Sequence, residues 1–93
     1  MMGNDGKTAA QGKPLHEIWV VMAPRIELYL RSFSGLSAPE QEDVLQEVMV
    51  ALWRGGPDGE DAIRPWLYRV ARNRAIDALR HAKRIQVRDH DDA

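Results

Sequence analysis

Apolar side chains recur at three- and four-residue steps in three stretches of the chain, which is the periodicity of an amphipathic helix. These stretches run from about Leu15 to Phe33, from Ser37 to Arg54 and from Ile63 to Arg84. Pro24 lies inside the first stretch, where it removes a backbone donor and crowds the preceding turn. The pattern therefore predicts an all-α fold, a compact bundle of three or four helices, with the first helix kinked or broken near Pro24.

The second stretch begins with a capping-box pattern, Ser37-Ala-Pro-Glu40, in which hydroxyl and carboxylate satisfy each other's free backbone donors. One face of this predicted helix is apolar. The opposite face carries Asp43, Gln46, Glu47, Val50 and Arg54. A valine on a polar face rimmed by acids is one way to make a partner site.

Residues 55–62, GGPDGEDA, are expected to form a loop, because glycine, proline and acids dominate them. The third stretch then has an apolar side for the core and a basic side. The basic side carries Arg69, Arg72, Ile76, Arg80 and Lys83 at helical steps, with Trp66, Asn73 and Arg84 at its edge. Cations bordered by amide and aromatic groups suit nucleic acid better than bare charge does.

Charge is segregated along the chain. Residues 63–88 hold eight Arg or Lys and one acid, whereas residues 36–61 hold seven acids and one cation. The formal net charge of −1 therefore hides a dipolar molecule. Such a chain can present one surface to a polyanion and another to a basic partner.

Ninety-three residues at 44% hydrophobic are expected to form one small domain. There is no cysteine, which excludes disulfides and thiolate metal sites. No apolar run approaches a membrane span, and the N-terminus lacks the apolar core of a secretory signal, so a soluble cytoplasmic protein is expected. We expect a disordered tail over residues 1–13, the helical domain over residues 14–85, and the start of an acidic linker or tail over residues 86–93.

Two segments carry a family resemblance: EQEDVLQEVMVALWRG (residues 40–55) and RPWLYRVARNRAIDALRHAKR (residues 64–84). They resemble region 2 of bacterial sigma-70-type factors, specifically the extracytoplasmic-function (ECF) group. That family shows an acidic D-x-x-Q-E helix ending in an aromatic, a variable loop, and a W-L-x-x-[IV]-A-x-N-x-[AI]-x-D-x-x-R helix. The resemblance covers residues 15–84 and implies that residues 14–85 form the region 2 domain.

The resemblance implies a function in transcription initiation, in which the domain docks on core RNA polymerase and recognises and melts the promoter −10 element. It assigns the acidic helix to the clamp helices of the largest catalytic subunits of RNA polymerase, with docking residues Asp43, Gln46 and Glu47 and with Val50 and Arg54 on the same face. It places near DNA the residues Tyr68, Arg69, Arg72, Asn73, Arg80 and Lys83. The loop of residues 55–62 would receive an unstacked base. An anti-sigma factor is a further expected partner, and no cofactor is implied.

The chain also departs from the family pattern. Housekeeping sigma factors carry extra aromatics just before the tryptophan of the third helix, where this chain has Ala62 and Pro65. Melting should then depend on the loop and impose stricter promoter demands. After Arg84 there is no room for the helix-turn-helix that reads the −35 element. The chain is thus expected to be an excised domain or a factor that works without that half.

Other interpretations of the same residues remain open. A sigma-like decoy or adaptor would bind polymerase or an anti-sigma factor without reading DNA, although it would not need the basic row. An enzyme is not expected, because no set of nucleophile and base, phosphate loop or metal cluster is found. Trp19 and Trp53 are expected in the core, and Trp66 is also expected to be packed. The three histidines share no metal-ligand spacing.

Overall fold

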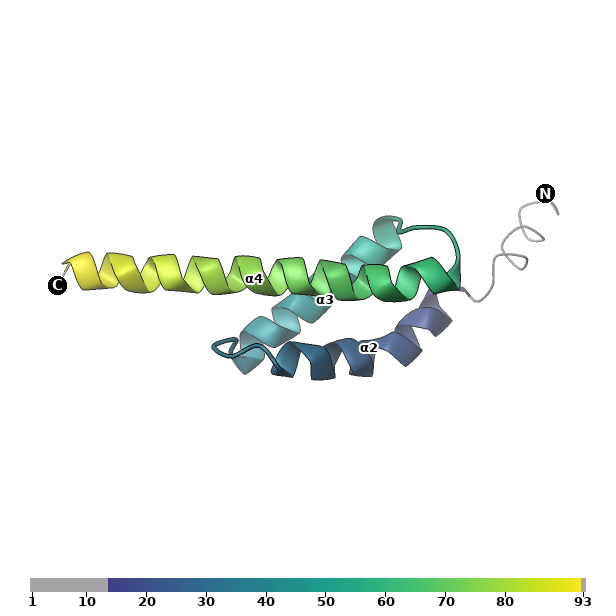
Figure 1. The fold of residues 1–93 in the computed structure, drawn as a ribbon, viewed down its shortest axis with the longest axis horizontal. Helices are drawn as coiled ribbons and strands as arrows, with labels where there is room; N and C mark the ends of the chain where they lie inside the picture. Colours follow the sequence, from purple (N-terminus) through teal and green to yellow (C-terminus); the bar gives the residue numbers. More distant parts are fainter. Residues whose placement is uncertain (1–13, 93) are drawn as a thin grey trace.

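The computed structural model describes residues 14–92 of the chain, and side chains for residues 14–83. This part forms three α-helices and no strand: α2 (Leu15–Arg31), α3 (Ala38–Arg54) and α4 (Glu60–Asp92). Each helix packs against the other two, and the long α4 lies across the shorter pair (Figure 1). The predicted all-α bundle is confirmed.

The core is built from stripes of side chains that repeat every four residues on each helix. The buried residues are Ile18, Met22, Ile26 and Leu30 from α2, Val44, Val48 and Leu52 from α3, Ile63, Leu67, Ala71 and Ala75 from α4, and Leu36 from the α2–α3 connection. All are aliphatic or thioether side chains. No polar or charged side chain is buried among those described. Aromatic rings instead border the core, half-buried, at Trp19, Tyr29, Phe33, Trp66 and Tyr68.

Of the two outcomes expected at Pro24, a kink or a break, the break does not occur, because α2 continues through Pro24 as one helix. Figure 1 shows α2 changing direction between its first turns and the rest, in keeping with the kink that a proline causes. Pro24 lies on the exposed side of α2, as does Val20, whose carbonyl loses its helical donor. Water can satisfy that carbonyl, and this is why the helix tolerates the proline.

The capping box at the start of α3 is confirmed. The Ser37 hydroxyl accepts from the backbone N–H of Glu40 at 3.3 Å, and the backbone N–H of Ser37 donates to Oε1 of Glu40 at 2.8 Å. These hydrogen bonds lower the pKa of the Glu40 carboxyl below its ordinary value of 4.5, the Ser37 backbone bond contributing most. Two donors that the helix itself cannot pair are thus satisfied locally.

The lowered pKa of Glu40 predicts an acid-sensitive contribution to stability. A carboxyl whose folded pKa is depressed contributes stability above its unfolded pKa and loses it as the pH falls through the folded pKa. The stability difference between wild type and Glu40→Gln should therefore be largest above pH 4.5 and shrink below it. Urea unfolding between pH 7 and pH 3 measures this difference. Glu42→Gln, outside the capping box, is the control, and a pH-independent difference for Glu40→Gln would contradict the prediction.

α4 differs from its predicted range at both ends. It begins at Glu60 because the carbonyl of Gly59, at φ 92°, accepts from the N–H groups of Ala62 and Ile63 at 3.2 and 3.0 Å. An ion pair of 2.8 Å between Glu60 and Arg64 spans the first turn. The connection to α3 is therefore shorter than the expected loop. α4 also continues beyond Arg84 to Asp92, so residues 86–92 are helical although the apolar pattern fades there. The expected tail of residues 1–13 lies outside the described residues.

Candidate functional site

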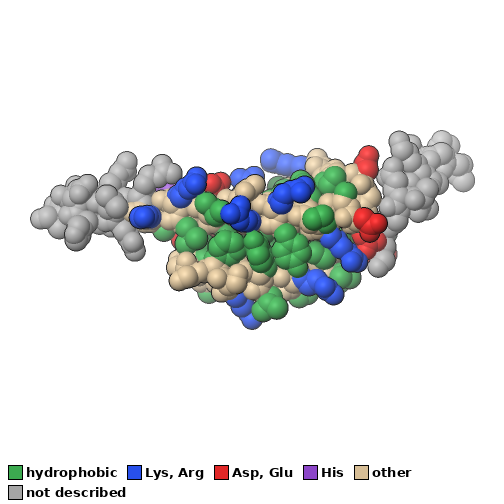
Figure 2. Space-filling model, in the orientation of Figure 1, with side chains coloured by type: hydrophobic (Ala, Val, Ile, Leu, Met, Phe, Trp, Pro, Cys, Tyr) green, Lys and Arg blue, Asp and Glu red, His purple; other side chains and the backbone are tan. Residues whose placement is uncertain are grey.

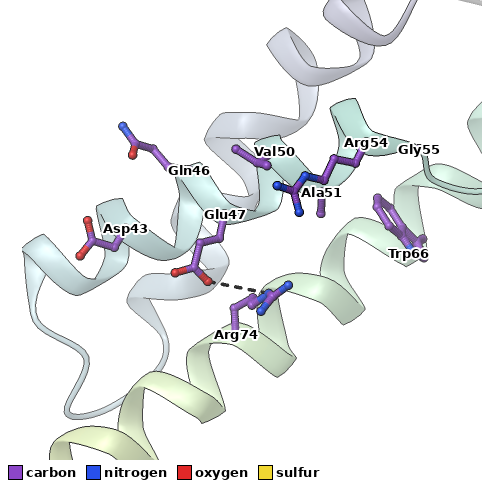
Figure 3. A pocket seen from close by; sticks show the side chains of 9 residues that line it. All are labelled: Asp43, Gln46, Glu47, Val50, Ala51, Arg54, Gly55, Trp66 and Arg74. Carbon is purple, nitrogen blue, oxygen red and sulfur yellow. Dashed lines mark ion pairs between the residues drawn. The ribbon is translucent and has the colours of Figure 1, made fainter.

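The outer face of α3 and the neighbouring face of α4 enclose an open groove of about 630 Å³. All five residues expected to bind a protein partner line it: Asp43, Gln46, Glu47, Val50 and Arg54. The opposite wall is made by Trp66 and Arg74 of α4 (Figure 3). The structure thus brings the five together on one rigid helix, and it adds two residues from the basic helix.

An ion pair crosses this groove. Nε of Arg74 lies 3.7 Å from Oε1 of Glu47, and both side chains are about half exposed (Figure 3). An exposed pair of this kind is worth roughly 0 to 1 kcal/mol. Arg74 therefore points toward α3 rather than joining the basic row, and Glu47 can exchange it for another cation at little cost.

The backbone at the start of the α3–α4 loop packs closely against the ring of Trp66. A Cβ added at Gly56 would lie 3.0 Å from Cζ3 of Trp66 and 3.2 Å from two further ring atoms. A side chain at this position would press on the ring, and the ring would have to shift by a few tenths of an ångström. Trp66 is half-buried and packed against the core, as the sequence predicted. The Trp66 side chain therefore borders both the groove and the α3–α4 loop.

The loop borders a second, smaller hollow of about 260 Å³. Residues 55–60 line one side of it, and Pro14, Leu15, Ile18 and Ile63 line the other. The loop expected to receive an unstacked nucleobase thus lies over a depression at the N-terminal ends of α2 and α4.

Five of the six residues expected near DNA are exposed on α4: Arg69, Arg72, Asn73, Arg80 and Lys83. They lie on the side of the helix away from its buried stripe of residues 63, 67, 71 and 75. In Figure 2 cationic side chains follow the coloured part of α4, with a band of hydrophobic side chains below them. The row is therefore continuous and outward-facing.

Tyr68, the sixth residue, has a different environment. It is half-buried, and its ring meets that of Tyr29 from α2 edge to face, with ring centres 5.2 Å apart. Tyr29 in turn meets Phe33 in the same geometry at 5.3 Å. Tyr68 thus lies at the border between the core and the basic row. The sequence gives no signal for this contact between α2 and α4, because helix periodicity alone does not show which rings meet.

The expectation that Trp53 is a core residue is wrong. Its side chain is 50% exposed, whereas Trp19 is half-buried against the core as expected. Val44, Val48 and Leu52 fix the buried stripe of α3, and Trp53 lies one residue, or about 100°, past it. It therefore projects to the outside, one turn beyond Val50.

In residues 14–83, whose side chains are described, no group of three or more His, Cys, Asp or Glu could hold a metal ion. Within the same part of the chain, no helix has the length and apolar character needed to cross a membrane.

Comparison with known protein families identifies the family of this chain. The family described as Sigma-70 region 2 matches residues 21–85, which is most of the chain and includes all of α3 and the larger parts of α2 and α4. The chain belongs to the sigma-70 region 2 family. A curated relative, the ECF RNA polymerase sigma factor RpoE of Cereibacter sphaeroides, is 29% identical over 76 residues. That alignment covers 78% of this region 2 chain and 41% of the relative. No solved structure gives a significant match.

The family match and the relative confirm the resemblance to region 2 of an ECF sigma factor. That relative is, by its name, an RNA polymerase sigma factor of the ECF group. The region 2 chain spans about two-fifths of the relative's length.

Proposed function

We propose that this chain docks on core RNA polymerase through α3 and recognises and melts the promoter −10 element through α4 and the loop before it. The observation that carries the proposal is the arrangement of charge in one small rigid body. The acids of α3 line the groove, while the cations of α4 form an outward row on another face of the same helix bundle. Two macromolecules can then be bound at the same time.

Docking would use the α3 wall of the groove. Asp43 and Glu47 offer carboxylates, Gln46 an amide and Val50 an exposed apolar contact, all fixed by one helix. A basic, amphipathic helical surface complements this set, and the clamp helices of the largest polymerase subunits are such a surface in this proposal. Figure 3 shows Asp43 and Gln46 pointing away from α4, which leaves both side chains open to contact from outside the bundle.

Promoter binding would use the row on α4. Arg69, Arg72, Arg80 and Lys83 would contact phosphates and supply most of the affinity. Asn73, within the row, and the loop beside its hollow would supply base selectivity. Opening the duplex needs no catalytic group, because preferential binding of unstacked bases shifts the equilibrium toward the open strand.

The exposed row also argues against the decoy alternative. A protein that bound only polymerase or an anti-sigma factor would gain nothing from keeping cations turned outward on α4. The proposed partners are core polymerase, −10 DNA and an anti-sigma factor, and polymerase would place the chain in the cytoplasm.

A paired binding experiment tests the proposal. The purified chain is first used to capture core RNA polymerase. It is then titrated against labelled single-stranded oligonucleotides carrying a set of −10 sequences, with a scrambled strand as the control. We expect capture of polymerase and a preference among the −10 strands. Capture without any preference over the scrambled strand would favour the decoy, and failure to capture polymerase would overturn the proposal.

Glu47→Ala and Gln46→Ala should weaken capture by polymerase while leaving the fold intact. Hydrogen bonds to charged groups contribute about 1.5 to 3 kcal/mol and neutral ones about 0.5 to 1.5 kcal/mol. Affinity should therefore fall on the order of 10- to 100-fold for Glu47→Ala and 2- to 10-fold for Gln46→Ala. Equilibrium titration against core polymerase measures both.

Glu42→Ala is the matched control for these docking variants, since Glu42 is an exposed acid on the same helix outside the groove lining. Its affinity for core polymerase should equal that of wild type. Wild-type affinity for both groove variants would show that the docking assignment is wrong.

A further inference from the structure

We propose that Trp53 is an anchor residue of the polymerase-docking face, filling an apolar site on a basic, amphipathic helical surface of core RNA polymerase. The inference rests on the proposed function and adds to its docking face the aromatic residue that ends the acidic-helix motif, for which the resemblance gave no docking role. It comes from one finding: the aromatic ring expected in the core is on the outside of α3.

Trp53 and Val50 form an exposed apolar pair. Trp53 is 50% exposed and Val50 is 43% exposed, on the same helix. Gln46, Val50 and Trp53 follow one another at steps of four and three residues, so they form one stripe on the outer side of α3. Trp53 therefore continues the stripe that Gln46 and Val50 begin in the groove.

The fold gives Trp53 little structural role. It does not belong to the core cluster or to the partly buried side chains packed against it, which include Trp19 and Trp66. The neighbouring Leu52 is fully buried and supplies this turn's contribution to the core. A large aromatic ring half exposed to water gains most by being covered, and a tryptophan offers roughly 150 to 250 Å² of contact.

The charges around the stripe indicate which partner covers it. Glu47 and Asp43 lie about two and three turns before Trp53 on the outer side of α3. Arg54 is the one cation among residues 36–61 of the sequence. A second copy of the chain would bring two net-negative faces together. A polymerase helix with apolar side chains flanked by Lys or Arg complements both the ring and the acids.

Interface energy is typically concentrated in a few central residues, among which tryptophan is enriched. Truncating such an anchor costs about 30-fold or more in affinity. We therefore expect Trp53→Ala to weaken binding to core RNA polymerase by about 30-fold or more. Trp53→Phe, which keeps an aromatic ring, should restore most of the affinity. Both variants should keep the thermal unfolding midpoint of wild type and its affinity for single-stranded −10 DNA.

The experiment titrates core RNA polymerase with wild type, Trp53→Ala, Trp53→Phe and the control Leu28→Ala, whose side chain is 66% exposed on α2. Equal affinities of wild type and Trp53→Ala would overturn the role of Trp53 and leave the docking proposal standing. Absence of wild-type binding would overturn both. Sedimentation of the same proteins tests the alternative that a second copy of the chain covers Trp53. If wild type formed a dimer that Trp53→Ala did not form, and polymerase affinity were unchanged, the ring would mediate self-association and the inference would be overturned.

Discussion

Arg69→Glu/Arg72→Glu is expected to lose at least about 60-fold in affinity for single-stranded −10 DNA at 50 mM salt. Each phosphate contact to a single strand contributes about 0.7 to the slope of log affinity against log salt. Over the range from 1 M down to 50 mM salt, this slope corresponds to a gain in affinity of about eightfold per contact. The variant removes two contacts, and the expected loss of affinity is therefore about 60-fold. The new carboxylates add repulsion. Both arginines are exposed on α4, so the fold should persist.

Anisotropy titrations of a labelled oligonucleotide at several salt concentrations measure the effect. Arg72→Ala, which removes one contact, should make the slope shallower by about 0.7. Arg25→Glu/Arg31→Glu on α2 is the matched control, because it changes net charge equally and both residues are exposed. If this control weakened binding as much as the α4 variant, affinity would depend on overall charge and the assigned DNA face would be wrong.

Leu67→Ala is expected to cost about 2 to 5 kcal/mol of unfolding free energy. Leu67 is fully buried in a core to which all three helices contribute. Truncation removes its transfer free energy and leaves a cavity that the aliphatic neighbours fill only in part. Total stability of a small domain is about 5 to 15 kcal/mol, so this one change could consume a large share of it.

Urea unfolding followed by helical circular dichroism measures this loss. Leu28→Ala is the same chemical change at a position that is 66% exposed, and it should shift the unfolding free energy by no more than about 0.5 kcal/mol. Similar losses for the two variants would mean that Leu67 does not occupy the core as described.

Local patterns in the sequence predicted most of the fold. The four-residue stripes, the cap at Ser37 and the groove-lining face of α3 depend on neighbours within one or two turns, which periodicity captures. The outward row on α4 was predictable for the same reason. The binding roles of these residues stay predictions, because they concern partners rather than the fold.

The differences from prediction arise where local pattern is ambiguous or where two helices meet. Trp53 directly follows the core residue Leu52. A residue at the edge of an apolar stripe can lie either in the core or on the surface, and periodicity does not distinguish the two. Tyr68 is placed by Tyr29, a contact between helices that no spacing reveals. α4 continues past Arg84 although its apolar pattern fades there, because backbone hydrogen bonding can extend a helix that has already formed.

The aliphatic core has a practical consequence for spectroscopy. Among the described side chains, the twelve buried core residues include no aromatic ring, and all three tryptophans lie half-buried or exposed. Intrinsic tryptophan emission should consequently report on what covers the surface more than on how well the interior is packed. Trp53 on α3 and Trp66 beside the loop would act as two native optical sensors, one for each partner, with no label attached.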